Sequence, residues 1–582
     1  MLFDGSAEMI VDSKGLPVAQ YFSEENNEFA VETTDGSLVL KSDYDFRLAT
    51  LIIDNKGFPI PQLWNPETEE FEVKTEQNSG GGNSGGKEES LAEKFGITGD
   101  GSIDNTRNVQ EAINYLHGIG GGTLELPGGV VRMGGVTLKS KVNMIGNREK
   151  LTTILIDDMP GITMESETLM KGLVIEGDSA NYFGDWNGGV RLQSGSKQVI
   201  ESCVFKKLYN CIYNQNAESF EIRKCWFNCD AEYGYGLYSE ISKFAVVEGC
   251  RFVCNKTESR PICFQFYAQN SLVKDNTIIG NGLAITGILF MNHYDNYNAA
   301  VYGNRVVGNY VSGVTEEGIS FDMMMESDKA FDTWIGGSVS SASNNIHSNA
   351  LVDNEVDLPN GVLYLRYLLI TSGKGEGQIR QITGNNGGSF SIDKPWVTIP
   401  DTTSTYIVGS FGFDNVIHDN TVENCGRHGL LLYGCNLRSH ITNNIVKNCG
   451  TNSDTTIYEW SGIGVVSCEA NEVMRFRPAI ANLVSDNTVS GGKTGIVVSS
   501  APWSGSYQPL MLPVKTVVKG NTLHDMQKGI WFREAKDSLI AANSIHGVLE
   551  PIILGVDTEN LILSNNLLDG SVNDQGTNNV LN

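Results

Sequence analysis

Residues 417–422 read Ile-His-Asp-Asn-Thr-Val, and the same apolar-x-x-Asn-x-apolar pattern returns as Ile-Thr-Asn-Asn-Ile-Val at 441–446 and Val-Ser-Asp-Asn-Thr-Val at 484–489. Further copies start at Val273, Val301, Val517, Ile540 and Ile562. One asparagine per repeat at a fixed position can stack into a ladder of side-chain amides, and asparagine also tolerates the left-handed backbone of a tight turn. The repeat therefore predicts an all-β solenoid of parallel strands.

A second repeated feature is a glycine that leads into an apolar strand, as in Gly-Ile-Ser-Phe-Asp at 318–322. These glycines are Gly287, Gly318, Gly429, Gly462, Gly495 and Gly529. They follow one another at nearly regular intervals, except for one much longer interval between Gly318 and Gly429. Within that interval, the segment 357–409 alternates apolar and polar side chains as antiparallel strands do. We therefore expect an inserted antiparallel β-domain at 357–409, which divides the solenoid into 91–356 and 410–582.

The segment 1–76 contains an internal duplication. Ile-Val-Asp-Ser-Lys-Gly-Leu-Pro-Val-Ala-Gln at 10–20 is echoed by Ile-Ile-Asp-Asn-Lys-Gly-Phe-Pro-Ile-Pro-Gln at 52–62. Each copy is typical of a β-hairpin with Lys-Gly at its turn. We interpret 1–76 as a small β adaptor, joined to the solenoid by a linker rich in glycine, serine and asparagine at 77–90.

An amphipathic helix is predicted directly after Asp104 and Asn105, either of which can cap it. Its apolar positions share one face: Val109, Ala112, Ile113 and Leu116. A helix placed here would cover the open edge of the first coil.

This start of the solenoid resembles a known family. The run Gly-Asp-Gly-Ser-Ile-Asp-Asn-Thr at 99–106, the helix, and Gly-Gly-Gly-Thr-Leu-Glu-Leu-Pro-Gly at 120–128 are similar to the start of the pectate-lyase-like β-helix superfamily. About 55 residues match closely, and many phage tail spikes and preneck appendages share this start. The resemblance implies a right-handed parallel β-helix, a homotrimer, and attachment of residues 1–76 to a phage tail or baseplate. It says less about chemistry, because the fold hosts lyases, hydrolases and pure binding proteins.

Composition excludes several function classes. The formal net charge is -27, with 69 acidic against 42 basic residues, which argues against a nucleic-acid partner. No run of about 18 apolar residues predicts membrane insertion, and the N-terminus lacks the pattern of a signal peptide. The 11 cysteines lie mostly in apolar runs and are expected to be reduced and buried, as in a protein folded in a reducing cytoplasm. We therefore expect assembly in the host cytoplasm and a final location in the virion.

The strongest site candidate comes from aligning coils by their glycines. Three pairs then share outward columns: Glu316 with Arg427, Glu317 with His428, and Asp322 with Tyr433. Carboxylates held close together repel, so the pKa of one rises towards that of a general acid while the other can act as base or nucleophile. The predicted catalytic residues are Glu317, Asp322, Glu316, His428 and Glu459.

Polar and aromatic side chains around this face supply the predicted substrate-binding residues. They are Arg427, Tyr433, Trp460, Glu240, Tyr238, His293 and Trp334. The aromatic rings offer flat apolar platforms for sugars. No metal-ligand pattern is present and no cofactor is required, although the sequence leaves a calcium ion open.

These features predict a tail spike or appendage protein that binds and endo-hydrolyses a bacterial surface glycopolymer, such as teichoic acid or capsule. Phosphodiester cleavage also stays open. The alternatives are a non-catalytic receptor-binding fibre, a metal-dependent polysaccharide lyase, and a purely structural appendage.

Overall fold

The computed structural model describes residues 89–582 apart from 158–159, 178–187, 293–299, 324–334, 346–347, 410, 454–458, 470–478 and 503–511. Within 1–88 it describes five short strands. The chain divides into two compact units, 1–88 and 89–582, and each is treated by itself.

The strands of the first unit repeat with the sequence. They are β1 (Tyr21–Ser23), β2 (Glu28–Glu32), β3 (Leu38–Leu40), β4 (Gln62–Asn65) and β5 (Glu70–Val73). β1 pairs antiparallel with β2 through Phe22 and Phe29, and β4 pairs with β5 through Trp64 and Phe71, which is the equivalent register in the second copy. The duplicated unit therefore contains an antiparallel strand pair, while the expected Lys-Gly turns lie outside the described residues.

The second unit begins with α1 (Leu91–Lys94) and α2 (Thr106–Gly118). The buried side chains of α2 are Val109, Ala112, Ile113 and Leu116, which confirms the predicted apolar face. Asn105 occupies the N-cap position, but its side chain bonds to Thr98. The Asp104 carboxylate accepts the Thr106 backbone N–H instead, at 2.9 Å.

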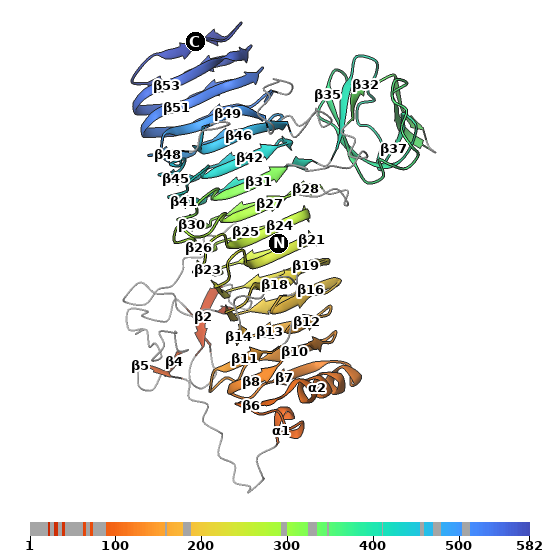
Figure 1. Cartoon of the computed structure of the whole chain (residues 1–582), viewed down its shortest axis with the longest axis vertical. Coiled ribbons are helices and arrows are strands. Elements are labelled where there is room, and N and C mark those ends of the chain that lie inside the picture. Colours follow the sequence, from red (N-terminus) through yellow and green to blue (C-terminus); the bar gives the residue numbers. More distant parts are fainter. Residues whose placement is uncertain are drawn as a thin grey trace. The chain divides into compact units, whose positions relative to one another are not determined.

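The rest of the unit is a parallel β-helix whose coils stack along one axis (Figure 1), as predicted. Among the described residues, one face of the solenoid is a 15-stranded parallel sheet. Its strands are β7 (Gly122–Glu125), β10 (Val142–Ile145), β13 (Leu169–Lys171), β16 (Gly195–Glu201), β19 (Ala217–Arg223), β22 (Val246–Glu248), β25 (Leu272–Lys274), β29 (Arg305–Val307), β40 (Val416–His418), β44 (His440–Thr442), β47 (Leu483–Ser485), β50 (Val517–Lys519), β52 (Leu539–Ala541), β54 (Ile562–Ser564) and β57 (Val580–Leu581).

Each coil then contributes two further strand segments to a larger sheet. The middle strands include β8 (Gly129–Met133), β11 (Thr152–Ile156), β14 (Leu173–Gly177), β17 (Val204–Lys206), β20 (Trp226–Cys229), β23 (Arg251–Cys254), β26 (Thr277–Ile279), β30 (Tyr310–Ser312), β41 (Thr421–Glu423), β45 (Ile445–Lys447) and β48 (Thr488–Ser490). The glycine-led strands, here called the third strands, include β15 (Val190–Leu192), β18 (Asn210–Asn214), β21 (Tyr235–Lys243), β24 (Arg260–Gln269), β27 (Ile288–Met291), β31 (Ile319–Met323), β42 (Leu430–Gly434), β46 (Ser461–Glu469) and β49 (Thr494–Pro502). In the last coils, β51 (Thr522–Lys536) and β53 (Ser544–Glu559) each run through both positions.

The predicted asparagine ladder is present at the corner before the middle strands. The Asn420 Nδ2 donates to Asn444 Oδ1 at 3.0 Å, and bonds of 2.9 to 3.0 Å link each member to the next. The members are Asn276, Asn309, Asn420, Asn444, Asn487, Asn521, Asn543 and Asn566. The residue before the ladder asparagine, such as Asp419, takes the left-handed backbone, so the asparagine itself serves the ladder.

The structure corrects the assignment of one residue to the asparagine ladder. Asn304, placed in the ladder from its sequence pattern, belongs to a different corner, where its Nδ2 donates to Asn415 Oδ1 at 3.0 Å. Asn309 takes the ladder position on that coil, because the segment carries an asparagine at both turns.

Cysteines continue the ladder towards the first coils. The backbone N–H of Cys203 points to Cys225 Sγ, that of Cys225 to Cys250 Sγ, and that of Cys250 to Asn276 Oδ1. The cysteines whose side chains the structure describes are buried, and none of them forms a disulfide, as expected.

The inserted domain is an antiparallel sheet, set beside the coils in Figure 1. Its strands are β32 (Ile335–Ser338), β33 (Ser341–Asn345), β34 (Ser348–Val352), β35 (Tyr367–Ser372), β36 (Ile379–Asn386), β37 (Ser389–Ile392) and β38 (Thr405–Gly409). The expected start at residue 357 is therefore too late, because β32 pairs with β38 and β34 with β37. The domain contacts the solenoid through an apolar cluster that joins Tyr367 and Leu369 to Phe413 and Leu437.

No helix among the described residues is long and apolar enough to cross a membrane.

Candidate functional site

The predicted column alignment is confirmed by the strand register. Ile319 pairs with Leu430 and Asp322 with Tyr433, so β31 and β42 stack with the glycines at the same level. The backbone N–H of Arg427 donates to the Glu316 carbonyl, and that of Gly318 donates to the His428 carbonyl. The parallel register therefore stacks Glu316 on Arg427 and Glu317 on His428 in the turn that leads into the third strands.

Arg427 organises the carboxylates of this cluster. Its Nη2 lies 2.8 Å from Glu316 Oε1, whereas its Nη1 lies 3.8 Å from Glu317 Oε1. The guanidinium also sits over the Trp460 ring, 4.8 Å from its centroid. Arg427 is thus held from two sides, and its charge is directed mainly at Glu316.

Glu317 is the unusual carboxyl of the site. Its residue is 8% exposed, and burial, together with repulsion from Glu316 and Asp322, raises its pKa to about 8. Burial also raises the pKa of Glu316, while Arg427 and Arg260 act in the opposite direction. Glu317 therefore carries its proton at neutral pH, which is the state that a general acid needs.

His428 is buried beside these carboxyls and is neutral. Burial, helped by the nearby Arg427 charge, lowers its pKa to about 3. Its Nδ1 lies 2.9 Å from Ser461 Oγ, and its ring meets the edge of Trp460 at a centroid distance of 5.3 Å. Gly464 makes room for the ring, since a Cβ at Gly464 would stand 2.9 Å from the imidazole Cε1 and Nδ1.

Glu459 belongs to the same face but has other partners. Its Oε1 accepts the Thr494 hydroxyl at 2.8 Å, and its Oε2 lies 2.6 Å from Lys528 Nζ. Both carboxylate oxygens are therefore engaged, one of them in a charge-assisted hydrogen bond, so Glu459 suits positioning better than proton transfer.

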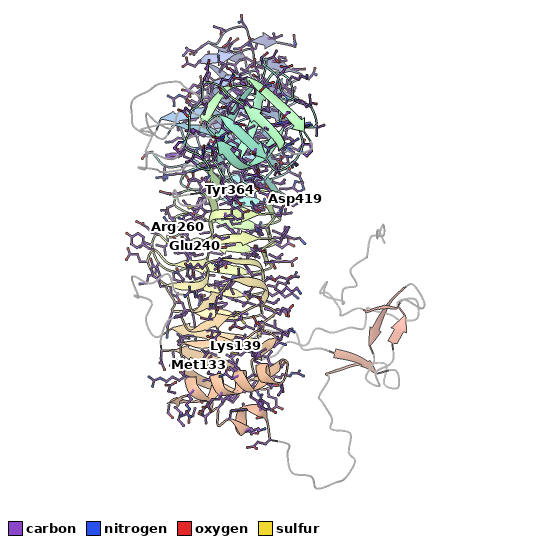
Figure 2. All side chains as sticks on the ribbon, turned by 90° about the vertical axis from the view of Figure 1, so that its right-hand side faces the viewer. Met133, Lys139, Glu240, Arg260, Tyr364 and Asp419 are labelled. Carbon is purple, nitrogen blue, oxygen red and sulfur yellow. The ribbon has the colours of Figure 1, made fainter. Side chains whose placement is uncertain are left out.

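Glu240 and Tyr238 lie on the same row of third strands, three coils before β31. The Tyr213 hydroxyl donates to Glu240 Oε1 at 3.0 Å, and burial raises the pKa of Glu240. Figure 2 labels Glu240 and Arg260; Arg260 belongs to the neighbouring strand β24, where the register pairs it with Tyr235. These residues form a separate patch along the face. The predicted His293 and Trp334 lie outside the described residues.

Sequence reasoning missed Lys528, Thr494, Ser461 and Arg260. Lys528 could have been found from the sequence, because it immediately precedes Gly529 and therefore falls in the same column as Glu317. Among the described residues, no group of three or more His, Cys, Asp or Glu side chains could hold a metal ion.

One family model agrees with the fold, and the sequence matches to curated proteins are short. The model for a right-handed beta helix region matches residues 188–356. A stretch of 60 residues is 42% identical to mannuronan C5-epimerase AlgE1 of Azotobacter vinelandii, but it covers 9% of this chain and 4% of the epimerase. The chain thus spans a small part of that relative.

Two solved structures are similar over most of this chain. The A-module of mannuronan C-5 epimerase AlgE6 from Azotobacter vinelandii is 14% identical, with a TM-score of 0.44, covering 82% of this chain and 99% of the module. A mutant tailspike of E. coli bacteriophage HK620 in complex with pentasaccharide is 11% identical, with a TM-score of 0.48, covering 83% of this chain and 77% of the tailspike.

Proposed function

We propose that this chain binds a bacterial surface glycopolymer on the outward face of its third strands and cleaves a glycosidic bond there by hydrolysis. The observation that carries the proposal is Glu317, a buried carboxyl with a pKa of about 8 beside further carboxyls on a solenoid face. The aromatic rings of Trp460 and Trp531, each with a cation beside it on this face, favour a sugar ligand.

In this mechanism Glu317 donates its proton to the departing glycosidic oxygen. Asp322, on the strand that follows, acts as the second carboxylate, either as a base that activates water or as a nucleophile. Arg427 neutralises Glu316, so that the charge repelling an ionised Glu317 is reduced but not removed. Trp460, packed against both Arg427 and His428, holds these two side chains in place.

The proposed setting is a phage tail spike or appendage in the virion. In this proposal residues 1–76 attach to the tail or baseplate and three copies assemble. The proposed polymer is teichoic acid or capsule, and a calcium ion is not required. The duplicated strand pairs of the first unit support an adaptor role.

The test is to incubate the protein with capsule and wall teichoic acid preparations from candidate hosts and follow polymer size by chromatography. We expect shortening that falls by about 100-fold or more in Glu317→Gln and in Asp322→Asn. Glu423→Gln is the matched control, because this carboxylate lies on β41 and pairs with Lys447.

Other results would replace the proposal. Shortening that survives both variants would discard the site but keep an enzyme. Products that absorb in the ultraviolet would indicate a lyase, and tight binding without shortening would indicate a receptor-binding fibre.

A further inference from the structure

The positions immediately before each third-strand glycine form one continuous column. Ser461 pairs with Thr494, and Thr494 with Lys528, in the parallel register of β46, β49 and β51. The same column continues back through His428 to Glu317. Successive members are therefore one strand spacing apart, about 4.8 Å.

Cations stacked on aromatic rings recur along this face. Arg427 lies 4.8 Å from the Trp460 ring centroid, and Lys528 Nζ lies 4.2 Å from that of Trp531. The register places Lys528 three coils beyond Arg427. The two cations are thus separated by about 14 Å along the solenoid axis.

The same axial interval is found in the other direction. Arg260 lies 5.7 Å from the Tyr235 ring centroid and three coils before Arg427. Three coils earlier again, Arg191 lies 5.9 Å from the Tyr213 ring. Four cation–aromatic pairs therefore follow one another along the axis at equal steps of about 14 Å. A further pair, Lys243 over Tyr267, lies apart from them near the C-terminal ends of β21 and β24.

These cations are held in place yet retain hydrogen-bonding capacity. Arg427 pairs with Glu316, and Lys528 pairs with Glu459. An arginine has five N–H donors and a lysine three, so one ion pair leaves others for a ligand. A ring beside a cation matches a unit made of a sugar and an anionic group.

We infer that this face is a binding track for an extended acidic glycan whose negative groups recur about every 14 Å, the spacing of the pairs. The inference rests on the proposed function and names its substrate class. Arg260 and Lys528 are the specificity residues that flank the cleavage point, one on each side. An uncharged polymer, or one whose negative groups have a different spacing, would engage fewer of the cation–aromatic pairs.

The test measures binding in the Glu317→Gln background, so that cleavage does not interfere. The probes are acidic capsule and its carboxyl-reduced form, and wall teichoic acid and its dephosphorylated form, which separate a carboxylate from a phosphate as the anion. Lys528→Met and Arg260→Met are compared with Arg251→Met, whose guanidinium stacks on Trp226 among the middle strands, 5.3 Å from the ring centroid.

We expect Lys528→Met and Arg260→Met each to weaken binding of the acidic polymer about tenfold. Neutralising the polymer should weaken binding at least as much, and Arg251→Met should leave binding unchanged. Equal binding of native and neutralised polymer, or wild-type affinity in both track variants, would overturn the inference while leaving Glu317-dependent shortening intact. Absence of binding by Glu317→Gln, together with absence of shortening by the wild type, with all four polymers would overturn the proposed function as well.

Discussion

Replacing Glu317 by glutamine should remove a pH-dependent penalty on folding. An ordinary glutamate has a pKa of 4.5, whereas burial raises that of Glu317 to about 8. Between these values the unfolded chain has lost the proton and the folded chain has kept it. Because the folded state binds more protons, the free energy of unfolding falls as pH rises through this window.

The size of the effect follows from the two pKa values. The contribution changes by about 1.4 kcal/mol per pH unit, which amounts to about 5 kcal/mol between pH 4.5 and 8. The penalty on folding is absent below the ordinary pKa of 4.5 and complete above the raised pKa of about 8. Glutamine keeps the size of the protonated carboxyl but does not titrate. Glu317→Gln should therefore match the wild type in acid and exceed its stability in base.

Two measurements check this reasoning. Infrared difference spectra of wild type minus Glu317→Gln titrate the band of the protonated carboxyl, which should disappear near pH 8. Unfolding rates in guanidinium at pH 5 and pH 9 test the predicted change in stability. Rates are used because a long solenoid need not unfold in two states, so an equilibrium free energy of unfolding is not well defined. An ionised carboxylate at pH 6, or rates that change in parallel for the two proteins, would refute the argument.

Three further predictions follow from the same geometry. Asn420→Ala should destabilise the fold by about 1–3 kcal/mol, because it leaves buried ladder groups without partners, and faster unfolding in guanidinium than the wild type checks this loss. Gly464→Ala should displace the His428 ring and lower polymer cleavage by about tenfold or more, with stability checked separately by thermal unfolding. Incubation with a chelator should leave polymer shortening unchanged, and a complete loss restored by added calcium would show that the mechanism needs a metal.

Much of the site could be predicted because a solenoid turns sequence spacing into spatial proximity. Counting from the glycines at 318 and 429 was enough to bring Glu316 to Arg427, although the whole inserted domain lies between them in the sequence. The count did not reveal that Arg427 approaches Glu316 more closely than Glu317. Which carboxylate Arg427 approaches depends on the side-chain rotamers and on Trp460, which packs against Arg427 from the next coil.

The sequence by itself determined the coil repeat, the asparagine ladder and the buried face of α2, because each depends on a local period. Only the tertiary structure decided that Asn309, not Asn304, joins the ladder, and that the inserted sheet begins at Ile335. These outcomes depend on which strand pairs with which, and β32 and β38 meet from distant parts of the chain. The raised pKa of Glu317 is of the same kind, because burial and neighbouring charges exist only after the coils have stacked.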